Sequence, residues 1–147
     1  MGTLLDTTVF IELERAIRRL PADRAMTEVS ARLSRQLGAA EETGIAAITA
    51  SELLHGVHRA TADYRPRREA FVEAVLVAFP PIPFDLLVAR AHARLWAELA
   101  ATGTDIGAHD RLVAATAITT GWKVATANVR HFDRIRGLDV TPVSLTN

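Results

Sequence analysis

Apolar residues recur at helical spacing along most of the chain, and short apolar runs separate these helical stretches. The amphipathic patterns predict helices that begin after residue 8 and at residue 49, and further helices over residues 24–42, 63–77, 85–101 and 111–120. The apolar runs predict buried strands at residues 3–5, 45–48, 123–126 and 140–143, with a short extended piece at 82–84. Pro83 predicts that this last piece is an edge strand or a strand end, because proline cannot donate a ladder hydrogen bond.

Strands that alternate with helices are typical of an α/β fold, in which helices cover both faces of a parallel sheet. A chain of 147 residues is long enough to form one core. We therefore expect a single domain over residues 1–147, with a short central sheet. Hydrophobic residues make up 49% of the chain and aromatic residues only 5%, so the core must be mainly aliphatic. The helix over 85–101 is expected to point four apolar residues inward, namely Leu87, Ala91, Leu95 and Leu99.

Charge and cysteine content exclude several kinds of function. Seventeen acidic residues balance seventeen Lys and Arg residues, so no bulk basic field indicates nucleic-acid binding. Lys123 is the only lysine; the other cations are arginines, which can bind phosphate bidentately and stack on bases. The absence of cysteine excludes disulfides, thiolate metal sites and cysteine nucleophiles. No apolar run approaches the roughly 20 residues that span a bilayer, and the N-terminus lacks a signal-peptide pattern. We therefore expect a soluble, cytoplasmic protein without a membrane partner.

Four oxygen-bearing side chains stand where predicted strands end or helices begin. They are Asp6, Glu52, Asp110 and Asn128. Ligands of open parallel sheets bind beyond the carboxyl ends of the strands, where we expect all four to lie. Carboxylate and amide oxygens suit hard cations such as Mg²⁺ or Mn²⁺, so the pattern predicts a metal site.

Each of these residues also has a purely structural interpretation. Asp6 could cap the helix that follows it, and Asp110 could favour the first turn of its helix through the helix dipole. Glu52 fits a capping box with Thr49 as the N-cap, and on local pattern alone this interpretation is the stronger one. Asn128 could be an ordinary turn residue. The shared position of all four at one sheet edge favours the metal site.

Four motifs carry a resemblance to a known family, and together they cover essentially the whole chain. They are LDTT at 5–8, ASELLHG at 50–56, IGAHDRLVAATA at 106–117 and VATANVRHFDRI at 124–135. In order and spacing they resemble the PIN-domain proteins, in particular the VapC-type toxin ribonucleases of bacterial toxin–antitoxin pairs. The resemblance implies a PIN-like fold and a ribonuclease that depends on Mg²⁺ or Mn²⁺.

Carried over by position, the resemblance assigns the metal ligands to Asp6, Glu52 and Asp110, with Thr8 and Thr126 as supporting hydroxyls. Asn128 stands where many relatives have a fourth aspartate. An amide oxygen can coordinate a cation or orient a water, but it adds no charge. We therefore predict one firmly held ion, and a second that binds weakly or only with RNA present.

The resemblance also implies partners: an RNA substrate, with transfer or ribosomal RNA as plausible targets, a cognate antitoxin whose tail covers the acidic groove, and a second copy of the chain in a homodimer. Apolar surfaces for these partners are expected near Val29, Leu33 and Leu37, or near Leu53 and Val57.

Several further polar residues are candidates for contacts at or near the site. Arg15, Arg18, Arg111 and Arg130 are candidates for phosphate contacts, and Asp105 for an outer contact to the metal. His55, His58, His109 and His131 are expected to pack or to face solvent.

Two other functions fit parts of the pattern. A catalytically degenerate PIN-fold binding protein would explain the asparagine at position 128. A phosphohydrolase with Asp6 as the nucleophile is disfavoured. Such enzymes carry an Asp-x-Asp motif near the start of the chain, and here position 8, where the second aspartate would stand, is threonine.

Overall fold

A five-stranded parallel sheet forms the centre of the molecule in the computed structural model, which describes residues 2–145. The strands are β1 (Gly2–Leu5), β2 (Glu42–Ala46), β3 (Pro81–Ile82), β4 (Lys123–Thr126) and β5 (Val140–Pro142). Their order across the sheet is β3-β2-β1-β4-β5, so the first strand lies in the middle. All four neighbouring pairs are parallel, as the alternation of strands and helices predicts.

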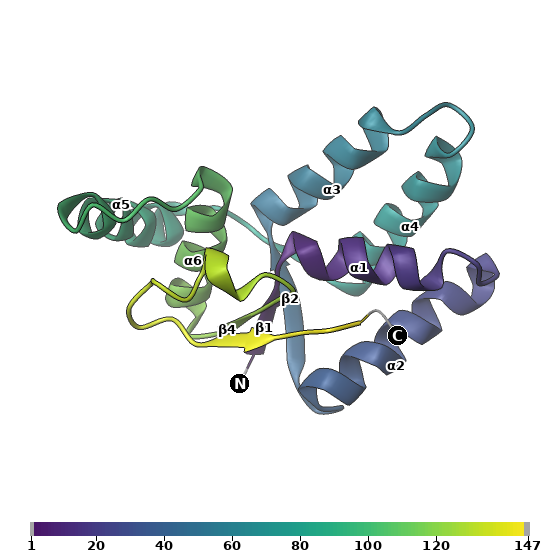
Figure 1. Cartoon of the computed structure of the whole chain (residues 1–147), viewed down its shortest axis with the longest axis horizontal. Coiled ribbons are helices and arrows are strands. Elements are labelled where there is room, and N and C mark those ends of the chain that lie inside the picture. The colour runs from purple at the N-terminus through teal and green to yellow at the C-terminus, as the bar shows by residue number, and fades with distance from the viewer. Residues whose placement is uncertain (1, 146–147) are drawn as a thin grey trace.

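Six helices and one short 3₁₀ turn, η1, connect the strands (Figure 1). The bounds are α1 (Thr7–Ile17), α2 (Ala22–Leu37), α3 (Ala47–Arg59), α4 (Arg65–Ala78), α5 (Leu86–Ala101), α6 (Ala108–Thr120) and η1 (Val129–His131). None of the described helices is both long and apolar enough to cross a membrane.

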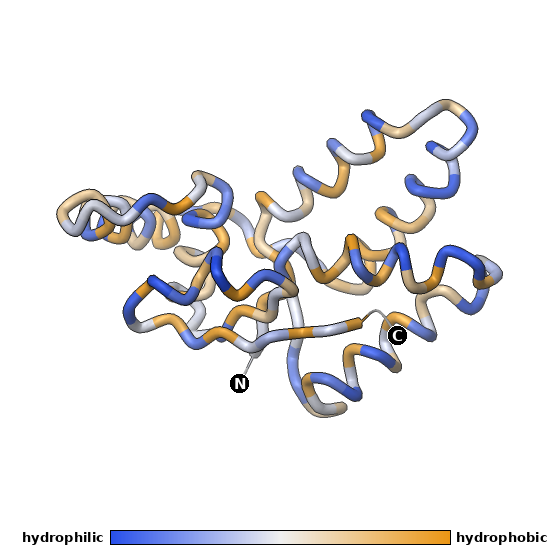
Figure 2. The backbone as a smooth tube through the Cα atoms, in the orientation of Figure 1, coloured by the Kyte–Doolittle hydropathy of each residue, from blue (hydrophilic) through white to orange (hydrophobic). Residues whose placement is uncertain are grey.

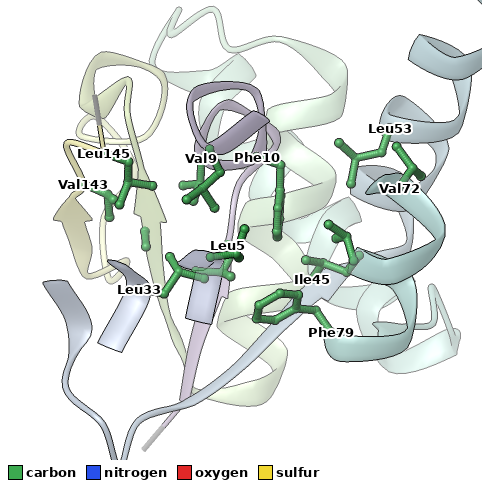
Figure 3. Packing of buried hydrophobic residues seen from close by; sticks show 14 of the residues in the cluster. Leu5, Val9, Phe10, Leu33, Ile45, Leu53, Val72, Phe79, Val143 and Leu145 are labelled. Carbon is green, nitrogen blue, oxygen red and sulfur yellow. The ribbon is translucent and has the colours of Figure 1, made fainter. Parts of the chain in front are cut away.

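The two faces of the sheet carry separate apolar clusters, because successive strand residues point to opposite sides. Leu5 faces a cluster built from α1, α2, α3 and α4 (Figure 3). Leu4 faces the other cluster, built mainly from α5 and α6. In the first cluster the rings of Phe10 and Phe79 meet edge to face, with centroids 5.5 Å apart. The predicted fold class, a short parallel sheet with helices on both faces, is thus confirmed.

Several predicted bounds were wrong. The helix predicted over 24–42 ends at Leu37, because Gly38 adopts φ 102° and leaves the helix. Residues 42–46 then form β2, so the predicted strand at 45–48 lies too far along the chain. Its second half belongs to α3, which begins at Ala47 rather than at Thr49. The apolar run continues from strand into helix without a change of composition, so hydrophobicity alone does not locate the junction.

The inward face of α5 also differs from the prediction. Leu95 and Leu99 are buried as expected, but Leu87 is 66% exposed and Val88 is buried in its place. The buried positions are therefore 88, 95 and 99, and Leu95 and Leu99 pack in one cluster with residues of α6. Gly121 forms the C-cap of α6 in the left-handed conformation, with φ 71°.

Candidate metal site at the carboxyl end of the sheet

The candidate site lies beyond the carboxyl ends of β1 and β4, which are neighbours in the centre of the sheet. The chain leaves β1 towards β2 on one side, whereas β4 lies on the other side, so a crevice forms where the connections diverge. Asp6 follows β1 directly, and its amide donates to the carbonyl of Ala125 at 3.0 Å. Thr126 is the last residue of β4. The sheet itself therefore sets the positions of these two residues.

Asp6 is nearly fully buried, with 3% of its surface exposed. Two hydroxyls donate to the same carboxylate oxygen, Oδ2: that of Thr8 at 2.8 Å and that of Thr126 at 2.9 Å. Asp6 occupies the N-cap position of α1, but its side chain makes no capping hydrogen bond. The helix-cap interpretation of Asp6 is therefore wrong. Its other oxygen, Oδ1, accepts no hydrogen bond from the described residues, which leaves it available to a ligand.

Glu52 lies in the second turn of α3 and faces the same edge of the sheet. Its Oε1 accepts a hydrogen bond from the Thr7 hydroxyl at 2.8 Å, and its Oε2 lies 3.4 Å from Nδ1 of His109. The predicted capping box is wrong, because α3 begins two residues before Thr49 and its N-cap, Ala46, has no capping side chain. The buried hydroxyl of Thr49 makes no hydrogen bond in the described structure.

Asp110 lies in the first turn of α6, as predicted. Burial raises the pKa of Asp110 above the usual aspartate value, and the negative charges of Asp6 and Glu52 raise it further. His131 and His109 act in the opposite direction. Asp110 Oδ2 lies 3.2 Å from Nδ1 of His131. The mutual influence of the three carboxylates shows that the fold brings them together, although the sequence separates them by dozens of residues.

Asn128 reaches the cluster through a histidine. Its side-chain Nδ2 lies 2.8 Å from Nε2 of His131, whose other ring nitrogen faces Asp110. Its backbone amide donates to the Thr126 hydroxyl at 3.0 Å. An amide can donate to a neutral imidazole nitrogen, and Nδ1 then carries the proton that points at Asp110. His131 thus connects the asparagine with the carboxylate.

The three carboxylates have only weak compensation for their charge. Within residues 2–145, no Lys or Arg side chain forms an ion pair with Asp6, Glu52 or Asp110. The side chains of their histidine neighbours are about half exposed, and they neutralise an acid only when they are protonated. This arrangement concentrates negative charge at one point of a protein whose formal net charge is zero.

We predict that Asp110→Asn stabilises the metal-free protein at neutral pH. The raised pKa means that folding favours the protonated carboxyl. Asp110 therefore contributes stability at pH values below its pKa in the unfolded chain, which is near 4. That contribution is lost as the pH rises through the higher folded value. In EDTA the variant should therefore melt at a higher temperature than the wild type at pH 7, with the difference shrinking as the pH falls towards 4. A lower melting temperature at pH 7 would contradict this, and Asp105→Asn, on an exposed residue, is the control.

Other predicted residues have different surroundings from those expected. Arg111 is engaged in the structure, because its Nη1 donates to the Ile106 carbonyl and its guanidinium stacks 5.1 Å from the Trp96 ring. These contacts hold the guanidinium in place, and its predicted phosphate contact stays a prediction. Arg130 and Asp105 are exposed and make no side-chain contact with the acidic cluster in the described chain.

The predicted partner surfaces were also wrong. Val29, Leu33, Leu53 and Val57 are all buried in the apolar cluster around α1, and Leu37 packs against it.

The sequence analysis missed three polar neighbours of the carboxylates. Thr7, a residue of the LDTT motif with no predicted role of its own, donates to Glu52. His109 and His131 were expected to pack or to face solvent, yet they approach Glu52 and Asp110. The position of the Thr7 hydroxyl directly after Asp6 could have indicated a role for it at the site. The histidine contacts join segments that lie far apart in the sequence, so local pattern gave no signal for them.

The comparison with known families agrees with this geometry. The chain belongs to the PIN domain family, which it matches over residues 3–138. Ribonuclease VapC1 of Rickettsia felis is 37% identical over 98% of both chains. The tRNA(fMet)-specific endonuclease VapC of Salmonella typhimurium is 33% identical over 65% of this chain and 71% of its own length. Within the family, the chain's place is therefore among the VapC ribonucleases.

A solved structure shows the same fold. DNA-bound VapBC from Salmonella typhimurium contains a chain that superposes with a TM-score of 0.77 at 27% identity, covering 97% of this chain and 98% of that one. The resemblance inferred from the four sequence motifs is thus confirmed over nearly the full length.

Proposed function

We propose that this chain is a divalent-metal-dependent endoribonuclease, built as a single domain, that acts as the toxin of a type II toxin–antitoxin pair. The observation that carries the metal dependence is the cluster of Asp6, Glu52 and Asp110, which holds three carboxylates together without an Arg or Lys partner among the described residues. A bound cation would relieve their repulsion. Oxygen donors of this kind suit Mg²⁺ or Mn²⁺.

The residues present fit such an ion. Oδ1 of Asp6 is free of hydrogen bonds within the described chain, while Thr8 and Thr126 fix the orientation of its carboxylate. In residues 2–145 no three acidic or histidine side chains, in the positions that they now occupy, lie close enough together to hold a metal ion. We therefore assign Glu52 and Asp110 as ligands that turn from the histidines towards the ion. When bound, the cation supplies Lewis-acid chemistry, polarising the phosphoryl group and offsetting the charge that develops on it.

Asn128 marks the weaker side of this site in the proposal. Its amide contributes no charge and lies against His131 at 2.8 Å. We infer that it orients His131 or a bound water, and that a second ion binds there only weakly or together with RNA.

Cleavage of RNA by the purified protein tests the proposed activity. We expect cleavage with Mg²⁺ or Mn²⁺, none with EDTA, and recovery when excess metal is restored. Transfer RNA is the first substrate to try, because the Salmonella relative is named as specific for tRNA(fMet). Cleavage that persists in EDTA would overturn metal dependence. If no RNA of a broad panel were cleaved, a degenerate binding protein would be favoured. A phosphorylated Asp6 would favour the phosphohydrolase.

We further propose a cognate antitoxin as the protein partner. Solved relatives at 27% and 26% identity are VapBC from Salmonella typhimurium and VapBC-5 from Mycobacterium tuberculosis, the latter described as a member of a toxin–antitoxin family. Co-expression with a candidate antitoxin should yield a co-purifying complex that does not cleave RNA. Full activity in such a complex would contradict the proposed inhibition.

We also propose that the chain forms a homodimer through the start of α5. Phe84, Leu86 and Leu87 are large apolar residues interrupted only by Asp85, the N-cap of α5, and each is about half exposed or more. Leu87→Glu should shift the protein from dimer to monomer in sedimentation analysis without lowering its melting temperature, because the side chain is 66% exposed. Val77→Glu, on an exposed residue of α4, is the control. An unchanged dimer, or a monomeric wild type, would contradict this interface.

A further inference from the structure

A cleft of about 450 Å³ leads away from the acidic cluster between α1, α3 and α4. Helices α1 and α3 both begin near the carboxyl edge of the sheet, and they separate from each other as they run away from it (Figure 1). The cleft is lined at one end by Thr7, Glu52 and His109, which belong to the candidate metal site. It therefore opens directly onto the position where the reaction is proposed to take place.

Residues at helical spacing line both walls of this cleft. On α1 and its C-cap they are Thr7, Ile11, Arg15 and Arg18, and on α3 they are Glu52, His55 and Arg59. Residues three and four positions apart lie on one face of a helix, so each wall is a continuous stripe. Each stripe begins at the acidic cluster and ends with arginine. Both helices end in hydrophilic residues, which agrees with the arginines at the far end of each stripe (Figure 2).

The arginines at the far end of the cleft differ in how they are engaged. Arg68 pairs with Glu14 through two contacts of 3.0 and 3.2 Å, so its charge is compensated and its position is fixed. Arg15, Arg18 and Arg59 are exposed and form no ion pair with other residues of the described chain. The Arg18 guanidinium lies 5.5 Å from the Tyr64 ring centroid, a contact that leaves its hydrogen-bond donors free. Three positive charges therefore remain available to an anion.

The floor of the cleft is apolar. Phe10, Leu53 and Val72 line it and are buried in the core, while Ile11 at its rim is 44% exposed. An apolar floor with a cationic rim suits a chain that is anionic along its backbone and apolar on the faces of its bases. Single-stranded RNA offers both features to a protein, because its bases can be unstacked and splayed out, whereas the bases of a duplex stay paired and stacked.

We propose that this cleft binds the ribose–phosphate backbone of single-stranded RNA on one side of the bond to be cleaved, with Arg15, Arg18 and Arg59 contacting phosphates. The inference rests on the proposed ribonuclease function and adds the path of the substrate. Arg59 lies seven residues beyond Glu52, about 10 Å along the axis of α3. Arg15 lies eight residues beyond Thr7, about 12 Å along α1. One phosphate cannot reach both ends of the cleft, so binding requires several nucleotides.

RNA binding by a cleavage-deficient protein tests this path. In an Asp6→Asn background, the affinity for a fluorescent 12-nucleotide single-stranded RNA of mixed sequence is measured by anisotropy at several salt concentrations. Arg15→Gln and Arg59→Gln should each raise Kd about fourfold at 0.15 M salt and reduce the slope of log K against log salt by about 0.7, the value for one phosphate contact of a single strand. The matched control is Arg90→Gln, on an exposed arginine of α5, which should bind like the parent.

Cleavage kinetics give a second readout in the protein with Asp6 intact. Arg15→Gln and Arg59→Gln should raise KM by a similar factor and leave kcat within about twofold, because they contact the substrate away from the reacting phosphate. Arg90→Gln should change neither constant. Circular dichroism melts of all variants should coincide, since the replaced side chains are exposed.

The possible outcomes separate this inference from the proposed function. If the wild type cleaves RNA but the cleft variants behave like Arg90→Gln, the path is wrong and the ribonuclease stands. If the wild type neither binds nor cleaves any RNA with metal present, the proposed function fails and this inference fails with it. If the cleft variants bind RNA normally but lose a co-purifying antitoxin, the cleft is a protein-docking site and the RNA assignment is overturned.

Discussion

Replacing Asp6 by asparagine should lower the rate of RNA cleavage by about a thousandfold or more, because loss of a metal ligand removes several kcal/mol of transition-state stabilisation. Asp6 is the most deeply placed of the three acids, and two threonine hydroxyls hold one of its oxygens while the other remains free within the described chain. Asparagine has nearly the same shape and keeps one oxygen, so the pocket can persist while the charge is lost. Single-turnover cleavage with saturating protein measures the effect on the chemical step.

Asp105→Asn is the matched control for this variant. Asp105 is an exposed acid in the loop before α6, and its side chain makes no contact with the acidic cluster among the described residues. Its rate should stay within about twofold of the wild type, as surface changes usually do little. An Asp6→Asn protein that retains a tenth or more of the wild-type rate would show that Asp6 does not hold an essential ion.

The largest effect on stability should come from Phe10→Ala, which should lower the free energy of unfolding by about 3–5 kcal/mol. Phe10 is 1% exposed and packs edge to face against Phe79 in the cluster that fixes α1 on the sheet (Figure 3). Urea denaturation followed by circular dichroism measures the change. A loss of this size is a large part of the total stability of a typical domain.

The neighbouring residue supplies the control for Phe10. Ile11 lies on the same helix but is 44% exposed, so Ile11→Ala should cost less than about 1 kcal/mol. Because α1 also carries Thr7 and Thr8, partial unfolding in Phe10→Ala should weaken RNA cleavage at 37 °C more than at 15 °C. Equal stability losses in the two variants would contradict the assigned burial of α1.

Local sequence patterns predicted the sheet and its functional edge well. The strand at 123–126 was predicted with its observed bounds, and Asp6 and Asp110 lie at the start of helices as expected. These successes share a cause, since strand apolarity and helix-start chemistry are properties of short segments. The same reasoning failed for Glu52, where a capping-box pattern coincided with a helix that had already begun at Ala47.

The supporting contacts of the site could not be derived from local pattern. The hydrogen bond from Thr126 to Asp6 joins residues 120 positions apart, and that from Thr7 to Glu52 joins residues 45 positions apart. Only the order of the strands in the sheet brings these partners together. The resemblance to a family supplied Thr126 as a supporting residue, but it supplied neither Thr7 nor the two histidines.

The structure gives Asn128 a physical role that an aspartate could not fill in the same way. Its amide nitrogen faces Nε2 of His131 at 2.8 Å, and a carboxylate has no proton to donate to a neutral imidazole. An aspartate here would place a second carboxylate beside His131 in place of this amide donor. The weak second metal position remains a prediction, and the asparagine–histidine contact is consistent with it.

Calorimetric titration of Mn²⁺ into the RNA-free protein tests the central claim most directly, because it measures the metal site without depending on the choice of substrate. We predict one site on the wild type, with any second site much weaker, and no measurable site on Asp110→Asn. Two equally tight sites on the wild type would contradict the role given to Asn128. Unchanged Mn²⁺ binding by Asp110→Asn, or no binding by the wild type, would contradict the metal site itself.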